Sequence, residues 1–554
     1  MDKSFFFDRN LLALAQRNPE LCTRLSNAET GLNHYKFLES RSGETIPAWV
    51  DPGGTAHPLH SIMDPRKEAK RLIDSVENQA FLVLLGLGGG YYAEAALERS
   101  RILLVIEYDI NGLAELLCHH DYAGLFGDPR FQLLVDPHDY ELRQCMLNLY
   151  QPVLYGGIRV IPLRSRTSLD TKPFAGAGIA IEAAIERISA DYSVQAHFGT
   201  RWFSNILRNL GPAEKFLDAI PPIRRAAVTA AGPSLGLQIN RLIEKRKELF
   251  LIAVDTSLPC LLHAGLIPDA VISIDCQHIS YYHFMDGLPA GVLLFLDLAS
   301  PPLLASGSKS PIFFSGGHPL TRYISRAWKA LPELDTSGGN VTYAAISLAE
   351  QLGAREIELY GADFSYPGGV SYARGAYIYP YFGNRQNRFA SMEAQASAFL
   401  FRTPLEKNYR SGSGWYYETK ALKFYREKLE EKSAVMEAAI IPIKGLGAPL
   451  NLRPGGSKQR SLRIFSSGKA LMSAGEFLSE YRTRTARLPP PDKNMAEYIG
   501  MLDSESQAVF ASLLPTAAAL ERRRPRGDFC KLFEETRAYC LKEIDGINKY
   551  IFAE

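Results

Sequence analysis

The residues with the clearest potential for chemistry follow apolar segments in the middle of the chain. Gly232-Pro233-Ser234 follows one such segment, and Asp255 and Asp275 follow the next two. Free backbone N–H groups at the start of a helix, together with a serine hydroxyl, suit a phosphate group. Carboxylates at neighbouring strand ends would lie beside that turn at one edge of a parallel sheet. The pattern predicts a site for a phosphorylated ligand, and the alternative is a simple helix cap formed by Ser234.

Two further glycine-rich turns occur later in the same region. They are Ser315-Gly316-Gly317-His318 and Ser337-Gly338-Gly339-Asn340. Beside the turn at Gly232, they would surround a diphosphate or a nucleoside phosphate. Each turn taken alone is equally compatible with a connection between two elements.

The last apolar segment of the series ends in Gly361-Ala362-Asp363, and Tyr366 follows shortly after. The loop 366–388 is rich in tyrosine and arginine and includes Arg374. A long loop of this composition over a crevice suits an anionic acceptor or a lid. An exposed loop that packs on a neighbouring domain is the competing interpretation.

A separate glycine-rich turn, Gly86-Leu87-Gly88-Gly89-Gly90, follows an apolar segment near the N-terminus, and Glu107 ends the next such segment. This arrangement is compatible with a dinucleotide or S-adenosylmethionine, with the acid on a ribose hydroxyl. The spacing departs from G-x-G-x-x-G because position 91 is tyrosine. A tight turn that binds no ligand is therefore the favoured interpretation.

The elements that would position these residues are strands alternating with helices. Continuous apolar runs are typical of strands buried on both faces of a parallel sheet. They occur at 81–85, 102–106, 131–135, 226–231, 249–254, 270–274, 292–296, 312–314 and 357–360. The sequence therefore predicts an α/β protein with two Rossmann-like parallel-sheet domains and a mainly helical C-terminal domain. The expected boundaries are 1–215, 216–412 and 413–554, with a linker at Pro489-Pro490-Pro491 that would make the last helices a separable module.

Composition excludes several classes of protein. Of 554 residues, 46% are hydrophobic, which excludes a disordered chain. Lys and Arg number 62 and Asp and Glu 60, so no broad basic surface for nucleic acid is expected. The seven cysteines form no C-x-x-C pair, and no apolar stretch is long enough to span a membrane. A soluble cytoplasmic protein is the expectation.

The region from about Arg225 to Arg402 resembles the MptE-like domain shared by bacterial motility accessory factors and archaeal 6-hydroxymethylpterin diphosphokinases. The residues that carry this resemblance are 231–235, 253–257, 265–269, 272–275, 339–342, 352–353 and 361–366. The flanking regions resemble those of the motility factors, which place a Rossmann-like domain before this one and a helical domain after it.

The resemblance implies a glycosyltransferase domain similar to bacterial sialyltransferases. Such proteins are taken to transfer a nonulosonic acid of the pseudaminic or legionaminic type from its CMP-sugar to Ser or Thr of flagellin in the cytoplasm. The CMP-activated sugar would be the donor, with no firmly expected cofactor or metal. The implied binding residues are Gly232, Pro233, Ser234, Asp255, Thr256, Ser257, Asp275, Ser315, Gly338, Gly339, Asn340 and Arg374, and the implied catalytic residues are Asp363, Tyr366 and His318.

The chain departs from the sialyltransferase pattern in one respect. Those enzymes use a histidine late in the domain as general base, whereas this chain has no histidine after His318. Asp363, Asp275 and His318 remain as candidates for the base. Two other functions stay open. One is a diphosphokinase that uses ATP and Mg²⁺ held by Asp255 or Asp275. The other is a non-catalytic flagellin-binding protein.

Overall fold

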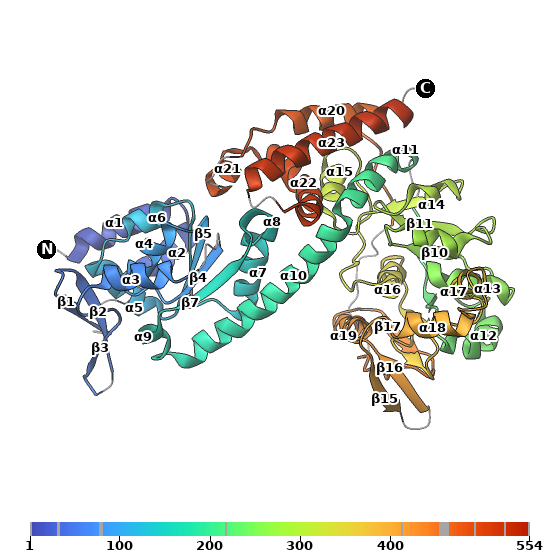
Figure 1. Ribbon diagram of the computed structural model, residues 1–554, viewed down its shortest axis with the longest axis horizontal. Coiled ribbons are helices and arrows are strands. Elements are labelled where there is room, and N and C mark those ends of the chain that lie inside the picture. Colours follow the sequence, from blue (N-terminus) through green and yellow to red (C-terminus); the bar gives the residue numbers. More distant parts are fainter. Residues whose placement is uncertain are drawn as a thin grey trace. The chain divides into compact units, whose positions relative to one another are not determined.

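The computed structural model describes the chain from residue 3 to 551, except for 30–33, 52, 77–80, 216–218, 411–413, 454–464, 492–494 and 526–527. The residues divide into two compact units. The first comprises Met1–Gly199, Pro489–Gln507 and Leu514–Thr536, and the second comprises Thr200–Leu488, Ala508–Leu513 and Arg537–Glu554. Figure 1 shows the elements of both units.

The first unit contains a parallel sheet of four strands in the order β6-β5-β4-β7. The central strands β4 (Phe81–Leu85) and β5 (Ile102–Glu107) are buried along their whole length. Their unbroken apolar sequence matches this burial, because helices cover both faces of a parallel sheet. The edge strands are β6 (Phe131–Val135) and β7 (Ile158–Pro162).

Helices and a small antiparallel sheet complete the first unit. The small sheet consists of β1 (Tyr35–Glu39), β2 (Thr45–Val50) and β3 (Ala56–Pro58). The helices are α1 (Lys3–Ala15), α2 (Pro19–Ser26), α3 (Pro65–Asp74), α4 (Tyr91–Leu97), α5 (Ile110–His119), α6 (Ala123–Gly127), α7 (Asp139–Leu149), α8 (Pro152–Tyr155), α9 (Arg164–Thr167) and the larger part of α10 (Thr171–Arg208).

The second unit is built on a parallel sheet of seven strands in the order β12-β11-β10-β9-β8-β13-β17. The strands are β8 (Arg225–Thr229), β9 (Phe250–Val254), β10 (Ala270–Ser273), β11 (Leu293–Asp297), β12 (Ile312–Phe314), β13 (Glu356–Tyr360) and β17 (Ala439–Pro442). From β8 the chain adds β9 to β12 on one side, and β13 and β17 lie on the other side. The strand order therefore reverses between β8 and β13, where α/β sheets of this kind form a crevice.

Helices and short 3₁₀ segments connect these strands. The connecting elements are α11 (Leu210–Ala213), α12 (Ser234–Lys245), η1 (Asp255–Ser257), α13 (Leu258–His263), η2 (His278–Phe284), α14 (Pro302–Ser306), α15 (Pro319–Ala327), α16 (Val341–Gln351), α17 (Ile378–Gly383), α18 (Met392–Leu400) and α19 (Lys420–Ser433). A second small antiparallel sheet has the order β14-β16-β15, with β14 at Tyr366–Pro367, β15 at Glu406–Arg410 and β16 at Gly414–Glu418.

The predicted α/β class with two parallel sheets and C-terminal helices is confirmed. All nine predicted strands are present, with ends shifted by at most two residues. The structure differs after residue 413, because β17 pairs with β13 and so belongs to the central sheet. Its four residues, Ala439–Pro442, are too few to give a pattern that sequence alone distinguishes from a loop.

The four C-terminal helices are α20 (Ala474–Arg487), α21 (Met495–Met501), α22 (Ser504–Arg523) and α23 (Phe529–Ile551). Segments of α22 and α23 are assigned to both compact units. Within the second unit, the Tyr481 and Ser512 hydroxyls are hydrogen-bonded at 2.7 Å while fully buried. These helices therefore contribute to the cores of the folded units and do not form a module of their own.

Candidate functional site

The end of β8 and the end of β13 meet through Ser234 and Asp363. The Ser234 N–H donates to Asp363 Oδ2 at 2.8 Å, and the Ser234 hydroxyl donates to Oδ1. Both residues are buried, with exposed fractions of 1% and 4%. The donors expected to hold a phosphate at Gly232-Pro233-Ser234 thus bind a carboxylate of the chain itself. Burial raises the pKa of Asp363, and the hydrogen bonds from Ser234 partly offset the rise.

A segment after β17, residues 443–448, lies over this pair, and we call it the strap. The Leu446 N–H donates to the Ser234 hydroxyl at 2.7 Å, and the Ala448 N–H donates to the Asp363 carbonyl at 3.0 Å. A Cβ at Gly445 would meet Ser234 Oγ at 2.5 Å, and a Cβ at Gly447 would overlap the Asp363 backbone. The strap therefore needs glycine at these positions to close the crevice between β8 and β13.

Asp255 and Asp275 end the neighbouring strands β9 and β10 but have different surroundings. Asp255 accepts hydrogen bonds from the Ser273 hydroxyl at 2.6 Å and from the Thr256 N–H at 2.7 Å. Asp275 Oδ1 accepts one from the Gln277 N–H at 2.9 Å. Burial raises the pKa of Asp275, and the charge of Asp255 raises it further. Asp275 is thus the carboxyl group better suited to accept a proton.

Ser257 has a structural role in the same turn. Its hydroxyl donates to the Val254 and Thr229 carbonyls, both at 2.9 Å, and the side chain is completely buried. The hydrogen bonds join η1 to the ends of β9 and β8. Ser257 therefore fixes the position of Asp255 and does not face a ligand.

The tyrosine-rich loop lies over the two aspartates. The Ala373 N–H donates to the Ala231 carbonyl at 2.9 Å, which attaches the loop to the end of β8. Burial raises the pKa of Tyr372 and of Tyr377, and the charge of Asp255 raises both further. Arg402 is close enough to lower the pKa of both tyrosines. The result is an aromatic cluster near Asp255, with Arg402 at its margin, where the guanidinium carbon lies 3.9 Å from the Phe399 ring centroid.

The residues at the margins of this cluster differ from those that the sequence predicts. His283 in η2 packs edge-on against Tyr377, with ring centroids 4.5 Å apart, and its buried Nδ1 has no hydrogen-bond partner. Sequence reasoning missed His283 and Arg402, although the tyrosines around His283 in 278–284 give some indication of an aromatic site. Arg374 is exposed on the loop, and Tyr366 lies in β14 where it pairs with Tyr417.

His318 caps α15 with its ring. The Leu320 N–H donates to His318 Nδ1 at 3.1 Å, and burial lowers the pKa of the imidazole to about 3. Because Nδ1 accepts, the neutral ring carries its proton on Nε2, which is buried and has no partner. This geometry gives His318 a free N–H donor and no available basic nitrogen. The nearby Ser315 hydroxyl donates to Thr321 Oγ1 at 3.0 Å.

The two later glycine-rich turns lie side by side. The Thr336 hydroxyl donates to the Gly316 carbonyl at 3.1 Å. Asn340 caps α16 by accepting from the Tyr343 N–H at 3.0 Å, and its amide donates to the Gly338 carbonyl at 3.1 Å. Gly339 has a φ of +72°, a left-handed conformation that favours glycine. The hydrogen bonds bring the two later turns together, and the Asn340 side chain is used as a cap.

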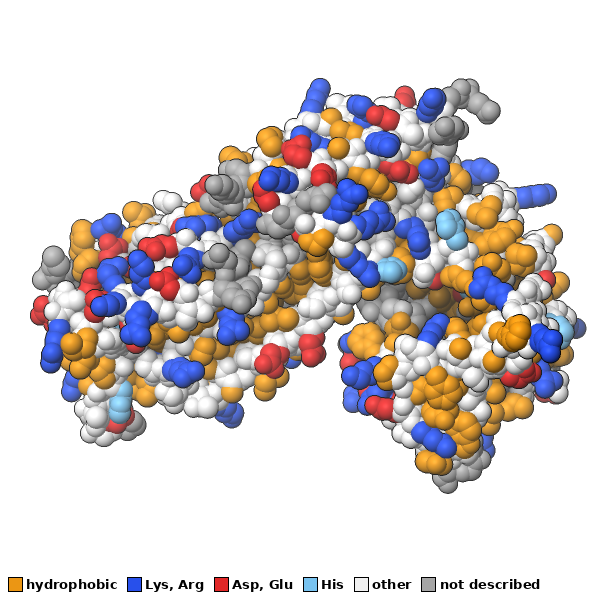
Figure 2. All heavy atoms as spheres, in the orientation of Figure 1, with side chains coloured by type: hydrophobic (Ala, Val, Ile, Leu, Met, Phe, Trp, Pro, Cys, Tyr) orange, Lys and Arg blue, Asp and Glu red, His pale blue; other side chains and the backbone are white. Residues whose placement is uncertain are grey.

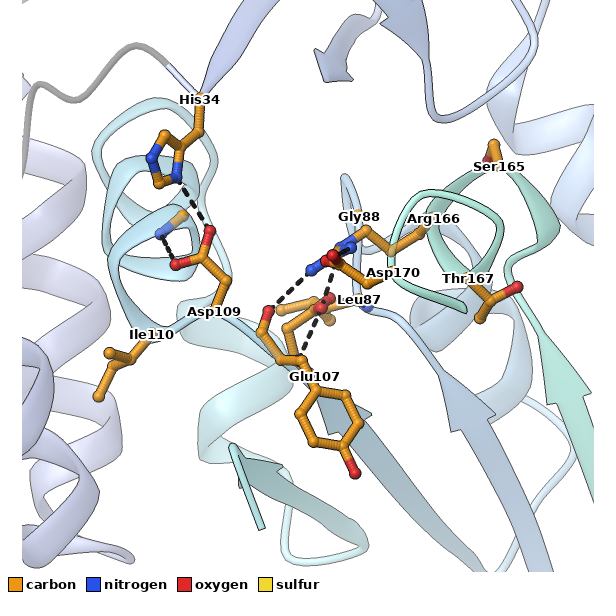
Figure 3. A network of polar contacts seen from close by, with 12 residues as sticks. His34, Leu87, Gly88, Glu107, Asp109, Ile110, Ser165, Arg166, Thr167 and Asp170 are labelled. Carbon is orange, nitrogen blue, oxygen red and sulfur yellow. Dashed lines mark hydrogen bonds and ion pairs between the residues drawn. The ribbon is translucent and has the colours of Figure 1, made fainter. Parts of the chain in front are cut away.

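The N-terminal glycine-rich turn is filled by side chains of the first unit (Figure 3). The Leu87 N–H donates to Glu107 Oε2 at 2.8 Å, and the Gly89 N–H donates to His60 Nε2 at 2.9 Å. Arg166 Nε lies 3.1 Å from Glu107 Oε1 with both side chains buried. A Cβ at Gly86 would meet the Arg166 side chain at 3.0 Å. The chain's own groups occupy the place of a cofactor phosphate and ribose, which supports the interpretation of a turn without a ligand.

Comparison with known proteins places the second unit in a family. Residues 200–369 match the model described as 6-hydroxymethylpterin diphosphokinase MptE-like. An uncharacterized protein of Treponema pallidum (strain Nichols) is 35% identical over 144 residues, which cover 26% of this chain and 67% of the relative. The chain belongs to the MptE-like family. Another uncharacterized Treponema protein is 33% identical over 187 residues, covering 33% of this chain and 66% of the relative. A third uncharacterized Treponema protein is 29% identical over 181 residues, which cover 31% of its length.

The fold of this MptE-like chain is similar to a solved structure described as the Maf glycosyltransferase from Magnetospirillum magneticum AMB-1. The TM-score is 0.61 at 14% identity, and the match covers 98% of this chain and 95% of that chain. The chain thus has the architecture of a Maf-type motility accessory factor, as the sequence resemblance predicts. The family model ends at residue 369, so Arg402 and the strap lie outside it.

No helix among the described residues is long and apolar enough to cross a membrane. Among the same residues, no group of three or more His, Cys, Asp or Glu side chains is arranged to hold a metal ion.

Proposed function

We propose that this MptE-like chain is a Maf-type glycosyltransferase. It transfers a nonulosonic acid of the pseudaminic or legionaminic type from the CMP-sugar to a Ser or Thr hydroxyl of flagellin, in the cytoplasm, in support of flagellum assembly and motility. The observation that carries the proposal is the likeness in fold to a Maf glycosyltransferase over 98% of the chain. The carboxylates and aromatic cluster at the ends of β9 and β10 supply suitable chemistry for the transfer.

The donor in this proposal carries a phosphodiester and a sugar carboxylate, so it needs a cation. Arg402 beside Tyr372 and Tyr377 provides one, and the tyrosine hydroxyls can donate to phosphate oxygens. We assign the phosphate to this cluster because Ser234 is engaged by Asp363. Asp255 holds its turn through Ser273 and Thr256, and Arg374 is exposed on the tyrosine-rich loop.

The adjoining turns would contact other parts of the donor. Gly338 and Gly339 present backbone groups beside Ser315, and Asn340 opens α16 there. The His318 Nε2–H can donate to a carbonyl or carboxylate oxygen. Tyr366, in β14, is three residues beyond Asp363, so we place it on the acceptor side of the site.

The reaction balances without a further reactant. The acceptor hydroxyl oxygen forms a bond to the anomeric carbon of the sugar, and the bond from that carbon to the phosphate oxygen breaks. CMP leaves with the electron pair, and Asp275 takes the proton of the hydroxyl. A raised pKa suits Asp275 for this role, while Arg402 offsets the charge that develops on the leaving phosphate.

The test is transfer by the purified protein. Flagellin and CMP-pseudaminic or CMP-legionaminic acid are incubated with the full chain, and the intact mass of flagellin is measured. Addition of one or more sugar masses is expected, and Asp275→Asn should abolish it without loss of CMP binding. No mass change with either donor, under conditions where CMP raises the melting temperature, would refute the flagellin transferase.

A diphosphokinase is the second candidate, because the matching family model carries that description. It would transfer a diphosphate from ATP to a small alcohol, with Mg²⁺ at Asp255 or Asp275. Thermal-shift measurements separate the two, since a ligand stabilises the state that binds it. Stabilisation by CMP supports the transferase, and stabilisation by ATP with Mg²⁺ supports the kinase. A chain stabilised by neither would be a non-catalytic flagellin-binding protein.

A further inference from the structure

The small sheet β14-β16-β15 presents one face of unusual composition. Because opposite residues in an antiparallel pair share a face, Lys407 lies beside Tyr417, and Tyr409 lies beside Trp415. Tyr409 is 76% exposed, and Phe401, 59% exposed, packs edge-on against the Tyr417 ring. We call this set the aromatic face. Figure 2 shows hydrophobic side chains gathered with basic ones over the region where Figure 1 places β15 and β16.

The opposite face of the same sheet has its partners within the second unit. Tyr416 and Glu418 are buried, and Glu418 accepts from Arg426 Nε of α19 at 3.1 Å. Arg410 donates to the Gly447 carbonyl of the strap at 2.8 Å. On the aromatic face, by contrast, Lys407 and Tyr409 are exposed, and Trp415 and Tyr417 are half-buried.

The strand β15 is an edge strand among the described residues, because the sheet order places it outside β16. Alternate residues of an edge strand direct their N–H and C=O groups outward, where an added strand can pair with them. The five residues Glu406–Arg410 contain no proline, which would otherwise block such pairing.

The charges near this edge favour an acidic partner. Apart from Arg402, which we place in the site, and Arg410, which binds the strap, the segment 384–410 contains three cations (Arg385, Arg388 and Lys407) and two acids (Glu393 and Glu406). The Lys407 amine lies 4.8 Å from the Trp415 ring centroid and 5.7 Å from that of Tyr409. A cation held over exposed rings forms a surface that contacts both apolar and anionic side chains.

The aromatic face leads directly to the candidate site. Tyr366 of β14 pairs with Tyr417, which pairs with Lys407, so the three side chains form one row across the sheet. With strands about 4.8 Å apart, this row spans about 10 Å from the edge strand to Tyr366. Tyr366 follows Asp363 by three residues, so a segment bound along β15 lies within reach of the site.

We infer that β15 and the aromatic face dock an extended, acidic segment of the acceptor polypeptide by adding it as a strand. The inference rests on the proposed transfer to a protein hydroxyl and names the surface that presents the hydroxyl. Main-chain hydrogen bonds to β15 would hold segments of varied sequence, while Lys407 and Tyr409 select for acidic and apolar side chains.

The test uses the full chain and a labelled synthetic peptide of alternating valine and glutamate around one serine, with binding followed by fluorescence anisotropy. Lys407→Glu and Tyr409→Ala are each expected to weaken binding by about tenfold, equivalent to about 1.4 kcal/mol. The matched control is Lys423→Glu, which makes the same charge change at an exposed position on α19. Circular dichroism and melting curves check that each variant is folded.

Each outcome decides the inference. Weaker binding by both Lys407→Glu and Tyr409→Ala, but not by Lys423→Glu, supports it. The inference is overturned if all variants bind the acidic peptide equally, if the wild-type chain does not bind it, or if a valine–lysine peptide binds equally well. It is also overturned if the chain forms a dimer that Lys407→Glu dissociates. The melting temperature with CMP is measured in parallel. If CMP binding and sugar transfer persist in a chain that fails the peptide test, the docking surface is wrong and the transferase stands.

Discussion

Two carboxyl groups at the carboxyl end of the central sheet, Asp363 and Asp275, differ in how their oxygens are used. Asp363 accepts from Ser234 with both oxygens, whereas Asp275, among the described residues, accepts only from Gln277, at 2.9 Å on Oδ1 and at 3.5 Å on Oδ2. A carboxylate whose oxygens both accept close hydrogen bonds is held in place, and one with a weakly bonded oxygen can take a proton. The first group is therefore structural, and we expect the second to be the reactive one.

We expect Asp275→Asn to lower kcat by at least about a hundredfold, because the general base is lost. In the wild-type chain the rate should fall as the pH is lowered through the raised pKa of Asp275, since the protonated acid accepts no proton. The variant should lose this acid limb. Initial rates across a pH series, with CMP affinity as the control, provide the measurement.

The same substitution should raise stability. A carboxyl group with a raised folded pKa favours the folded state below its unfolded pKa and loses that contribution as the pH rises through the folded pKa. Asp275 therefore opposes folding at neutral pH, and asparagine removes this effect. A higher melting temperature for Asp275→Asn at pH 7, with little difference near pH 3, is expected. An unchanged or lower value at pH 7 would contradict the assigned desolvation.

Ser234→Ala should act mainly on stability. It removes the hydroxyl that donates to Asp363 and accepts from the Leu446 N–H. The buried Asp363 carboxylate then has one hydrogen bond fewer. A loss of about 1.5–3 kcal/mol in the free energy of unfolding is expected. Urea unfolding of Ser234→Ala, Asp363→Asn and the double variant measures the coupling. Additive effects would show that Ser234 and Asp363 are not coupled. A loss of CMP affinity with unchanged stability would return Ser234 to the role of a phosphate ligand.

At the scale of elements, the strap and the glycines within it determine access to the crevice between β8 and β13. Gly447→Ala would force a methyl group against the Asp363 backbone, and overpacking of this kind lowers stability by about 1–3 kcal/mol. Gly236→Ala in α12 is the matched control, because no atom lies within 4 Å of its added Cβ and alanine favours a helix. Thermal unfolding of both variants compares them, and equal melting temperatures would show that the strap is loosely held.

The elements that sequence predicts and those it misses differ in the range of their contacts. The strands around Ala226 and Ile272 are recognisable because their apolar runs are buried on both faces. The contact between Ser234 and the strap joins residues more than two hundred positions apart, and nothing in either segment alone indicates the other. Sequence therefore predicts correctly that Asp255 and Asp275 follow strand ends. It predicts a phosphate as the partner of Ser234, whereas in the fold the partner is Asp363.

At the scale of the whole molecule, the C-terminal helices are part of both compact units. Truncation after Arg487 would remove Leu513, Phe533 and Ile544, which are fully buried. It would also remove Ser512, the hydrogen-bond partner of the Tyr481 hydroxyl. Loss of such buried side chains lowers stability by several kcal/mol. We expect the truncated chain to be aggregated or to lack a cooperative melting transition in differential scanning calorimetry.

The exposed ion pair between Arg482 and Asp545 serves as the control for this truncation. Arg482→Gln should change the free energy of unfolding by less than about 1 kcal/mol, because exposed pairs contribute little. A soluble truncated chain with the melting temperature of the full chain would show that the helices are a separable module after all.

The order in which the strands are synthesised has a consequence for the nascent protein. The edge strand β17 and the strap follow β13 by about 80 to 90 residues along the chain. At translation rates of roughly 5–20 residues per second, a ribosome needs on the order of 5–20 seconds to add them. Throughout that interval Ser234 and Asp363 are uncovered on one side, and β13 offers an unpaired edge. Chaperones that recognise open strand edges would therefore meet this protein at one defined stage of its synthesis, after residue 360 and before residue 448.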